Sequence, residues 1–260
     1  MRSVKELFDL SGKVALCTAS SKGMGLAMAE GLAEQGAKVV ISSRKLDACQ
    51  AAADDINQKF GEGSAIAIAC NVGYKEQLQA LVDDTREKLG SIDILVSNAG
   101  VNPYYGPMSK IPDAAFDKIM NSNVRSTHWI CNMVIPDMVA KGKGSIMVTA
   151  STGAFGPSLE LGVYAVSKLA DIGLVRNMAL EFGPSGVRVN AICPGVIKTD
   201  FAKALWDSPE GEARAAETVP LRKFGEADDL KGLAVYLASD ASGHMTGQAL
   251  TVCGGTNMWT

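Results

Sequence analysis

The order of the apolar segments constrains this chain more than any other feature of its sequence. Seven short apolar runs alternate with longer stretches in which apolar residues recur every three to four positions. The short runs predict strands buried on both faces of a sheet, and the periodic stretches predict helices. The predicted strands are residues 14–17, 38–42, 65–70, 92–96, 145–149, 187–192 and 249–252. The predicted helices are residues 24–35, 46–60, 76–89, 123–140, 164–182 and 227–238.

Strands and helices that alternate in this way are typical of α/β proteins. We expect a single-domain Rossmann fold over residues 1–260, in which a doubly wound, seven-stranded parallel sheet carries helices on both faces. The least regular region, residues 194–225, is expected to form short helices in a long insertion, and such insertions are usually functional.

Composition excludes several classes of protein. Hydrophobic residues make up 47% and charged residues 20% of the chain, which excludes a disordered protein. The formal net charge of −3 gives no support for binding to nucleic acid or to a membrane surface. No apolar run approaches the ~20 residues that span a bilayer, and the N-terminus lacks the apolar core of an export signal. We therefore expect a cytoplasmic protein. Its six scattered cysteines and two distant histidines predict reduced thiols and no metal site.

A turn that contains glycines follows the first predicted strand and leads into the first predicted helix. Glycines let a pyrophosphate approach the backbone, and the N-terminus of a helix offers it unpaired N–H groups and a positive dipole. The G-x-G-x-x-G spacing is absent, because Met28 stands where the third glycine would fall. An ordinary turn is therefore the alternative. The residues predicted to bind a dinucleotide here are Thr18, Ser20, Ser21, Lys22, Gly23, Met24 and Gly25.

The end of the second predicted strand favours NADP(H) over NAD(H). Proteins that bind NAD place an acidic residue about 20 positions beyond the glycine turn, where it binds the ribose hydroxyls. Ser43 and Arg44 stand there instead, and a guanidinium group suits a 2′-phosphate. Lys22 adds a second cation inside the turn. The alternative is that Arg44 and Lys22 are solvated charges that bind no ligand.

Three further residues form a candidate catalytic group. Tyr164 and Lys168 lie four positions apart at the start of a predicted helix, so they share a face, and Ser151 follows a predicted strand. A tyrosine hydroxyl is a weak acid at neutral pH, but a neighbouring ammonium group stabilises its phenolate form. A serine hydroxyl can stabilise the charge that develops on a substrate oxygen. The Y-x-x-x-K spacing often arises by chance, but together with the glycine turn it predicts carbonyl reduction or alcohol oxidation.

These motifs resemble those of the short-chain dehydrogenase/reductase family, and the resemblance extends from Gly12 to Gly255. It implies that Asn123 completes a catalytic tetrad with Ser151, Tyr164 and Lys168, and that Asn123 holds a water molecule of a proton relay. It also implies further cofactor contacts, namely the Asn98-Ala99-Gly100 motif, Pro194, Gly195, Ile197 and Thr199, with Asn71-Val72 in place of the usual Asp-Val.

Within the family, the closer resemblance is to animal NADPH-dependent carbonyl reductases, in strings such as Ser42-Ser43-Arg44-Lys45. Four positions depart from the usual family pattern: Ala19, Asn71, Ser97 and Cys253. We expect Ala19 to be tolerated, because alanine fits most turn positions in which φ is negative. The resemblance also implies a homotetramer that pairs through the helices predicted at residues 123–140 and 164–182.

The loops at the carboxyl ends of the predicted strands carry many apolar side chains, and ligands of open α/β sheets bind at those ends. The predicted walls of a substrate pocket are Tyr104, Phe155, Leu159, Phe201 and Trp206, with residues 199–220 as a lid. Such walls suit a medium-sized ketone, aldehyde or α-dicarbonyl. Alternatively, several of these residues belong to the core or to an interface.

Together these features predict an NADPH-dependent oxidoreductase that reduces a carbonyl to an alcohol, with Tyr164 as the general acid or base. The same tetrad would serve an alcohol, sugar or 3-oxoacyl-thioester oxidoreductase, and the sequence does not choose among these substrates. A protein that senses the nucleotide without catalysis is a third interpretation, which the intact tetrad disfavours.

Overall fold

The computed structural model describes residues 1–258, and its centre is a parallel sheet of seven strands in the order β3-β2-β1-β4-β5-β6-β7. The strands are β1 (Val14–Thr18), β2 (Lys38–Ser43), β3 (Ala65–Ala69), β4 (Ile94–Ser97), β5 (Gly144–Thr149), β6 (Val187–Pro194) and β7 (Ala249–Val252). The winding direction reverses between β1 and β4, which lie side by side. The predicted doubly wound parallel sheet is therefore confirmed.

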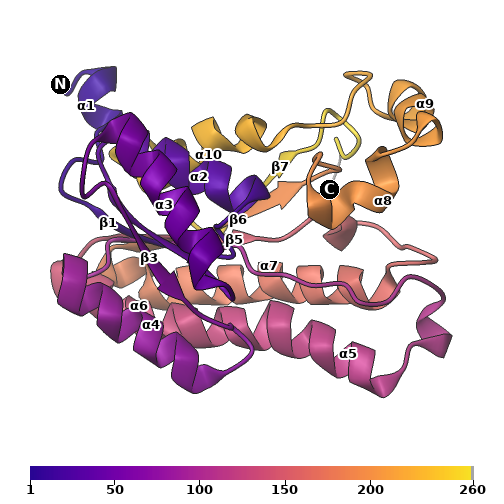
Figure 1. Ribbon diagram of the computed structural model, residues 1–260, viewed down its shortest axis with the longest axis horizontal. Helices are drawn as coiled ribbons and strands as arrows, with labels where there is room; N and C mark the ends of the chain where they lie inside the picture. Colours follow the sequence, from indigo (N-terminus) through magenta and orange to yellow (C-terminus); the bar gives the residue numbers. More distant parts are fainter. Residues whose placement is uncertain (259–260) are drawn as a thin grey trace.

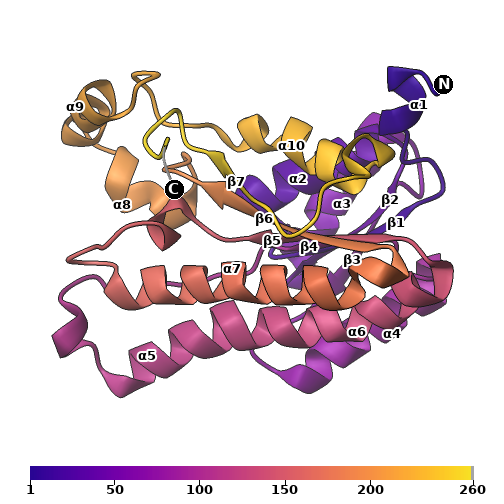
Figure 2. The ribbon, with the colours of Figure 1, turned by 180° about the vertical axis from the view of Figure 1, so that it is seen from behind.

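Helices cover both faces of the sheet (Figures 1 and 2). α2 (Gly23–Glu34), α3 (Leu46–Phe60) and α10 (Lys231–Ala238) lie on one face. α4 (Lys75–Leu89), α6 (Ser126–Lys141) and α7 (Gly162–Phe182) lie on the other. The short helices are α1 (Val4–Phe8), α5 (Asp113–Ile119), α8 (Lys203–Trp206) and α9 (Pro209–Thr218).

The two faces of the sheet carry separate hydrophobic cores, because successive side chains of a strand point to opposite sides. In β1, Leu16 packs in the core beneath α4, α6 and α7, whereas Cys17 packs in the core beneath α2, α3 and α10. Val40 and Ile41 of β2 divide in the same way. Both faces are thus buried, which explains why the strands are continuous apolar runs rather than alternating ones.

The structure differs from the predicted elements most in the segment before α6. The helix predicted at residues 123–140 belongs to a longer helical run that starts with α5 and passes through a wide π-helical turn at Met120–Arg125. Only Ile119 of α5 is buried, so the sequence carries little apolar periodicity there. The predicted helix at 227–238 begins with a tight 3₁₀ turn, Ala227–Leu230, before α10. Both π-turns and 3₁₀ turns escape a search for a 3.6-residue period.

The predicted insertion is confirmed as a region of short helices. α8 and α9 lie beyond the carboxyl ends of the strands (Figure 1). They surround a small core of Ala215, Val219 and Phe224, to which Trp206 packs. We call residues 199–220 the lid.

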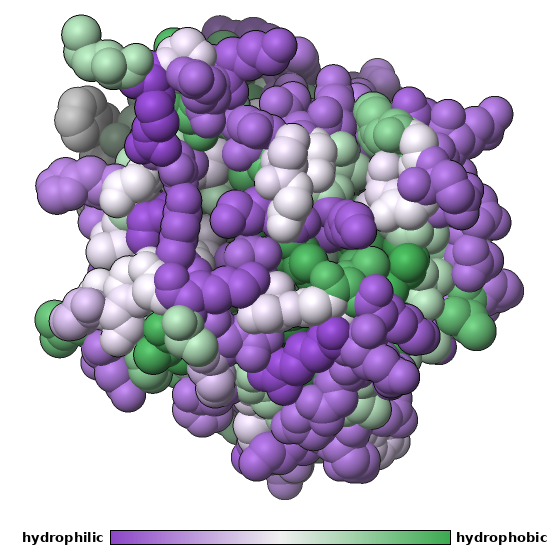
Figure 3. Space-filling model, turned by 90° about the vertical axis from the view of Figure 1, so that its left-hand side faces the viewer, coloured by the Kyte–Doolittle hydropathy of each residue, from purple (hydrophilic) through white to green (hydrophobic). Residues whose placement is uncertain are grey.

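The face of the molecule opposite the lid is mainly hydrophilic, with apolar side chains gathered in a limited area (Figure 3). Within residues 1–258, no helix is both long and apolar enough to cross a membrane. No group of three or more His, Cys, Asp or Glu side chains in this range could hold a metal ion.

One expectation about the glycine turn is wrong. Ala19 has a φ of 49°, which is the left-handed region that L-residues other than glycine rarely adopt. A negative φ was expected at this position. The left-handed conformation brings the Cβ of an L-residue close to the following carbonyl oxygen, so Ala19 is strained where a glycine would not be.

Replacement of Ala19 by glycine is therefore expected to stabilise the protein. The free energy of unfolding should rise by about 1 kcal/mol, which corresponds to a Tm higher by about 2–4 °C in a chain of this size. Ala51→Gly, in an exposed position within α3, is the matched control and should lower the free energy of unfolding by about 1 kcal/mol. Thermal unfolding of both variants measures the difference. A Tm of Ala19→Gly at or below that of the wild type would contradict the strain.

Candidate active site

The turn between β1 and α2 has the shape of a phosphate cradle. Gly23 lies in the left-handed region, with a φ of 59°. A Cβ atom on Gly25 would collide with the carbonyl oxygen of Ala19 and lie 2.6 Å from Nδ2 of Asn98. Only glycine fits this position without displacing the backbone, so the loop stays close to the first turn of α2.

Side-chain hydroxyl and amide groups stabilise this turn through hydrogen bonds to the backbone. Thr18 Oγ1 accepts a hydrogen bond from the backbone N–H of Asn98 (3.0 Å), and Asn98 Nδ2 donates to the carbonyl of Ala19 (3.0 Å). Ser20 is fully buried, donates to the carbonyl of Cys17 and accepts from the N–H of Ser42. The side chains of Thr18 and Ser20 thus hold the loop. Ser21, Gly23 and Met24 are half-buried.

The cations predicted to select NADP(H) stand at the rim of the turn. Arg44 is exposed just beyond the end of β2 and forms no ion pair with any residue in the range 1–258. Ser43 contacts Cys49 Sγ at 3.1 Å. Lys22 pairs with Asp200 of the lid at 2.6 Å, and both side chains are more than two-thirds exposed (72% and 69%). An ion pair so exposed is weak, so it leaves Lys22 available to a phosphate.

Two residues lie where the third strand ends. Asn71 Oδ1 accepts a hydrogen bond from the N–H of Gly73 (3.1 Å), and its own N–H donates to Gln77. Val72 packs against the core beneath α4. The amide oxygen of Asn71 thus shapes its own loop, and its second lone pair is left to accept from a ligand.

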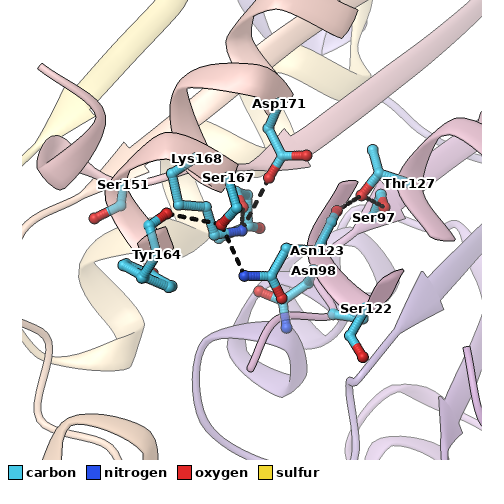
Figure 4. Close-up of polar contacts among 12 residues, drawn as sticks. Ser97, Asn98, Ser122, Asn123, Thr127, Ser151, Tyr164, Ser167, Lys168 and Asp171 are labelled. Carbon is cyan, nitrogen blue, oxygen red and sulfur yellow. Dashed lines mark hydrogen bonds and ion pairs between the residues drawn. The ribbon is translucent and has the colours of Figure 1, made fainter. Parts of the chain in front are cut away.

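Tyr164 and Ser151 come from different elements, and both lie at the carboxyl edge of the sheet. Tyr164 lies in the first turn of α7, and Ser151 follows β5. Figure 4 shows both residues on the same side of Lys168. Ser151 Oγ accepts a hydrogen bond from the N–H of Gly153 (3.0 Å), which leaves its proton free to donate. The ring of Phe201 lies 6.2 Å from that of Tyr164, so the lid reaches this group.

Lys168 is buried, and its ammonium group lies 5.9 Å from the centre of the Tyr164 ring. Its Nζ donates to the carbonyl of Thr149 (2.7 Å) and to Oδ2 of Asp171 (3.1 Å). Burial by itself lowers the pKa of Lys168, but Asp171 and Tyr164 outweigh that effect and leave the pKa raised. Lys168 is therefore an ammonium ion beside Tyr164 at neutral pH.

Asn123 lies in the π-helical turn between α5 and α6. Its Oδ1 accepts from the N–H of Val101 (2.8 Å), while its Nδ2 donates to the carbonyl of Val101 and to Ser167 Oγ (3.0 Å). Ser167 in turn donates to the carbonyl of Tyr164. Asn123 thus ties the loop after β4 to α7, and it reaches Lys168 through no direct hydrogen bond. π-Turns of this kind are frequent at functional sites.

The loops after β4 and β6 complete the edge of the site. In the loop after β4, Asn98 is half-buried and Ala99 is buried. A Cβ atom on Gly100 would lie 3.4 Å from Lys168 Nζ. On the other loop, Pro194 and Ile197 are buried. A Cβ atom on Gly195 would lie 2.9 Å from that of Cys253. Thr199 lies 3.3 Å from a Cβ atom built on Gly23, so this loop borders the glycine turn.

The predicted substrate walls divide into two groups. Tyr104 borders a narrow hollow that Asn102, Glu160 and Tyr164 also line. With Phe201, it therefore lies beside Tyr164. Trp206 packs on the small core of the lid and donates its indole N–H to the carbonyl of Thr199 (2.9 Å).

Phe155 and Leu159 lie less favourably for contact with a substrate. Phe155 packs against the core beneath α7, and Leu159 is 90% exposed. Their role in the pocket remains a prediction. A wider open groove along β3, lined by side chains such as Asp54 and Asn57, contains none of the candidate site residues.

Three residues of this site were not predicted from the sequence: Ser167, Asp171 and Asp200. Asp171 carried a usable signal, because it lies three positions after Lys168 and seven after Tyr164, on the same face of an otherwise apolar stretch. The contact of Asp200 with Lys22 spans 178 positions, and no local pattern predicts it.

The arrangement fits a nicotinamide dinucleotide. Two of the four buried side-chain atoms that lack a hydrogen-bond partner within residues 1–258 lie at this edge: Asn98 Oδ1 and Thr149 Oγ1. Buried polar atoms normally have partners, and a bound ligand or water molecule would supply the partners that these two atoms lack. The glycine turn offers space and N–H groups for the phosphates, and Arg44 stands beside it.

Comparison with known proteins supports this assignment. Residues 18–257 match the family model described as "Enoyl-(Acyl carrier protein) reductase". The chain is 40% identical to human dehydrogenase/reductase SDR family member 4 over 248 residues, which are 95% of this chain and 88% of that protein.

Two solved structures are similar over almost the whole chain. One is a gluconate 5-dehydrogenase from Burkholderia cenocepacia in complex with NADP and tartrate (TM-score 0.92, 30% identity, 98% of each chain). The other is a 7α-hydroxysteroid dehydrogenase in complex with NADH and 7-oxo glycochenodeoxycholic acid (TM-score 0.92, 36% identity, 98% of each chain). One of these relatives thus holds NADP and the other NADH.

The fold and these relatives define an oxidoreductase that uses a nicotinamide cofactor. The chain belongs to the short-chain dehydrogenase/reductase family.

Proposed function

We propose that this protein is an NADPH-dependent reductase that converts a ketone, aldehyde or α-dicarbonyl into an alcohol. The observation that carries the proposal is the group formed by Tyr164, Ser151 and the buried ammonium of Lys168 at the carboxyl edge of the sheet. The exposed Arg44, which has no ion-pair partner within residues 1–258, supports the preference for NADP(H).

Each residue of the group has a distinct task in this proposal. A bound nicotinamide supplies the hydride to the carbonyl carbon, or accepts it in the reverse direction. Ser151 donates a hydrogen bond to the substrate oxygen, where negative charge develops. Tyr164 donates a proton to that oxygen, and Lys168 stabilises the phenolate that remains. Asn123 holds a water molecule through which the proton is replaced from solvent.

The cofactor would lie along the carboxyl ends of the strands. In this arrangement the turn from Gly23 to Gly25 binds the phosphates, and Arg44 and Lys22 bind the 2′-phosphate. Asn71 and Val72 border the adenine, and Lys168 binds the nicotinamide ribose. The loop that contains Ile197 and Thr199 borders the carboxamide.

The proposal is tested by the loss of reduced-nicotinamide absorbance with the purified protein. NADPH and NADH are run in parallel against aryl ketones, α-diketones, retinal, sugars and an acetoacetyl thioester. We expect turnover of apolar carbonyls with NADPH. NADPH binding without turnover of any carbonyl would contradict the proposal.

A second candidate is oxidation or reduction of a sugar-like substrate. Asn102 and Glu160 lie with Tyr164 around a narrow hollow, and their polar groups suit the hydroxyls of a sugar better than they suit an apolar ketone. Turnover of sugars or sugar acids in the same panel, without turnover of aryl ketones, would select this candidate.

We further propose that the protein is a homotetramer. Val166, Leu169 and Leu180 of α7 are at least half exposed, as is usual for a surface that a partner covers. Their spacing places them along one side of the helix. Light scattering at micromolar concentration is expected to give four times the mass of the chain, and Leu169→Glu should reduce that mass. A monomeric wild type would contradict the proposal.

We also propose that the lid closes over the substrate and that the protein works in the cytoplasm. The first rests on the contact between Phe201 and Tyr164. The second rests on the cysteines, all six of which are free thiols, five of them buried.

A further inference from the structure

Asp171 is a buried carboxylate that the proposed mechanism does not use. It lies in α7, three residues after Lys168, and its side chain is entirely shielded from solvent. A charged group is rarely buried in this way unless it is paired, because burial removes its hydration. The surroundings of Asp171 are therefore informative about its role.

The only ionic partner of Asp171 within residues 1–258 is Lys168. Lys168 Nζ donates to Asp171 Oδ2 at 3.1 Å, and the side chains of Lys168 and Asp171 are 4% and 0% exposed, respectively. Lys168 Nζ also donates to a second acceptor, the backbone carbonyl of Thr149, at 2.7 Å. In Figure 4 the ammonium group lies between Tyr164 on one side and Asp171 on the other. Asp171 and Thr149 thus hold Nζ from the side away from the reacting edge.

The other ionisable groups around the pair do not supply a counter-charge. Cys193, from β6, and Cys131, from α6, both face it, but burial raises the pKa of the first thiol to about 11 and of the second to about 12. Both are neutral at physiological pH. Tyr164, on α7, is the group whose proton the proposed reaction transfers, so it is not a permanent counter-charge. Asp171 is therefore the group that balances the charge of Lys168.

Burial acts on the two partners in opposite senses. It lowers the pKa of Lys168, an effect that Asp171 and Tyr164 reverse, so that the pKa of Lys168 is raised overall. Burial raises the pKa of Asp171, and the charge of Lys168 offsets only part of that increase. Without the carboxylate, the burial of Lys168 would favour its neutral amine form.

We propose that Asp171 is a positioning residue that keeps Lys168 charged and holds its ammonium group beside Tyr164. This inference rests on the proposed function, because it assigns to Lys168 the task of stabilising the Tyr164 phenolate. A purely structural role for Asp171 would not require that its charge affect the chemistry at Tyr164.

The first test is the pH profile of alcohol oxidation in Asp171→Asn, which keeps the size of the side chain but removes its charge. We expect kcat at neutral pH to fall by ~10-fold or more. The midpoint of the profile should move by about one pH unit or more to higher pH, because a neutral Lys168 no longer favours the phenolate. The substrate KM should change little.

Val175→Ala is the matched control, since Val175 is also fully buried on α7, one turn further on. It should lower the Tm without moving the midpoint. An unchanged midpoint in Asp171→Asn, or a move to lower pH, would overturn the proposal. The latter would mean that Lys168 stays charged without Asp171.

The second test needs no activity and so separates this inference from the proposed function. Lys168→Met leaves Asp171 buried without a counter-charge, so its Tm at about pH 8 should be well below that of the wild type. Addition of Asp171→Asn to Lys168→Met should restore part of the lost Tm, whereas the same change in the wild type lowers it. If the second substitution lowers the Tm in both backgrounds, the pair is not ionised and the inference fails, whatever the substrate proves to be.

Discussion

Tyr164→Phe is expected to reduce kcat by ~10²–10⁴-fold, the contribution typical of a positioned general acid. The substitution removes only the hydroxyl group and keeps the aromatic ring, so the fold should be unaffected. The Kd for NADPH should therefore stay within about twofold of the wild type, because the loss falls on the transition state. Steady-state kinetics with the best carbonyl from the panel, together with NADPH titration by fluorescence, measures both quantities.

Tyr236→Phe is the matched control for this prediction. Tyr236 lies in α10, where its ring packs near Phe8, away from the catalytic group. The kcat of the Tyr236→Phe variant should equal that of the wild type. Retention of most activity in Tyr164→Phe would show that another group supplies the proton, and it would remove the central residue of the proposed mechanism.

The second large effect is expected from Arg44→Asp. A hydrogen bond between a charged donor and a phosphate contributes about 1.5–3 kcal/mol, so the KM for NADPH should rise by about 10- to 100-fold. The KM for NADH should fall, because an acidic residue at this position can bind the ribose hydroxyls. The preference between the two cofactors should therefore reverse or nearly vanish.

Lys38→Asp serves as the control for the change of charge. Lys38 is exposed at the opposite end of the same strand, β2. The substitution Lys38→Asp changes the net charge by the same amount as Arg44→Asp, but it should leave the KM values for both cofactors unchanged. An unchanged KM for NADPH in Arg44→Asp would mean that Arg44 is a solvated charge and that the assignment of NADP(H) needs another basis.

Much of the fold follows from local pattern. The β1 and β2 strands were recognisable because both faces of each are buried, which makes them continuous apolar runs. The glycine turn was recognisable because its backbone conformation and its close contacts exclude side chains at Gly25. The helices with regular apolar stripes were also predicted, with bounds that differ by a few residues.

Elements that depart from regular periods were not predicted. The π-helical turn that contains Asn123 has no signature at a 3.6-residue period, and α5 buries too little apolar surface to show one. The positive φ of Ala19 is set by the tight turn between β1 and α2, not by the preference of alanine. The prediction for Ala19 was wrong because the identity of one residue does not reveal the backbone angle that the surrounding structure imposes on it.

The candidate site shows the same division. The sequence by itself determined which residue types are present at the ends of the strands: Tyr164 and Lys168 on one helical face, Ser151 after a strand, and Arg44 in place of an acidic residue. Spacing within a helix or next to a strand is local information, and it can be read along the chain.

Only the tertiary structure decided what these groups contact. It brought the lid to the glycine turn through Lys22 and Asp200, and it buried Asp171 against Lys168 among neutral neighbours. Contacts of this kind depend on which elements pack together and on how far water is excluded, and neither is encoded in any single segment. Water exclusion determines whether a charge such as that of Asp171 is an ordinary surface group or a counter-ion for catalysis.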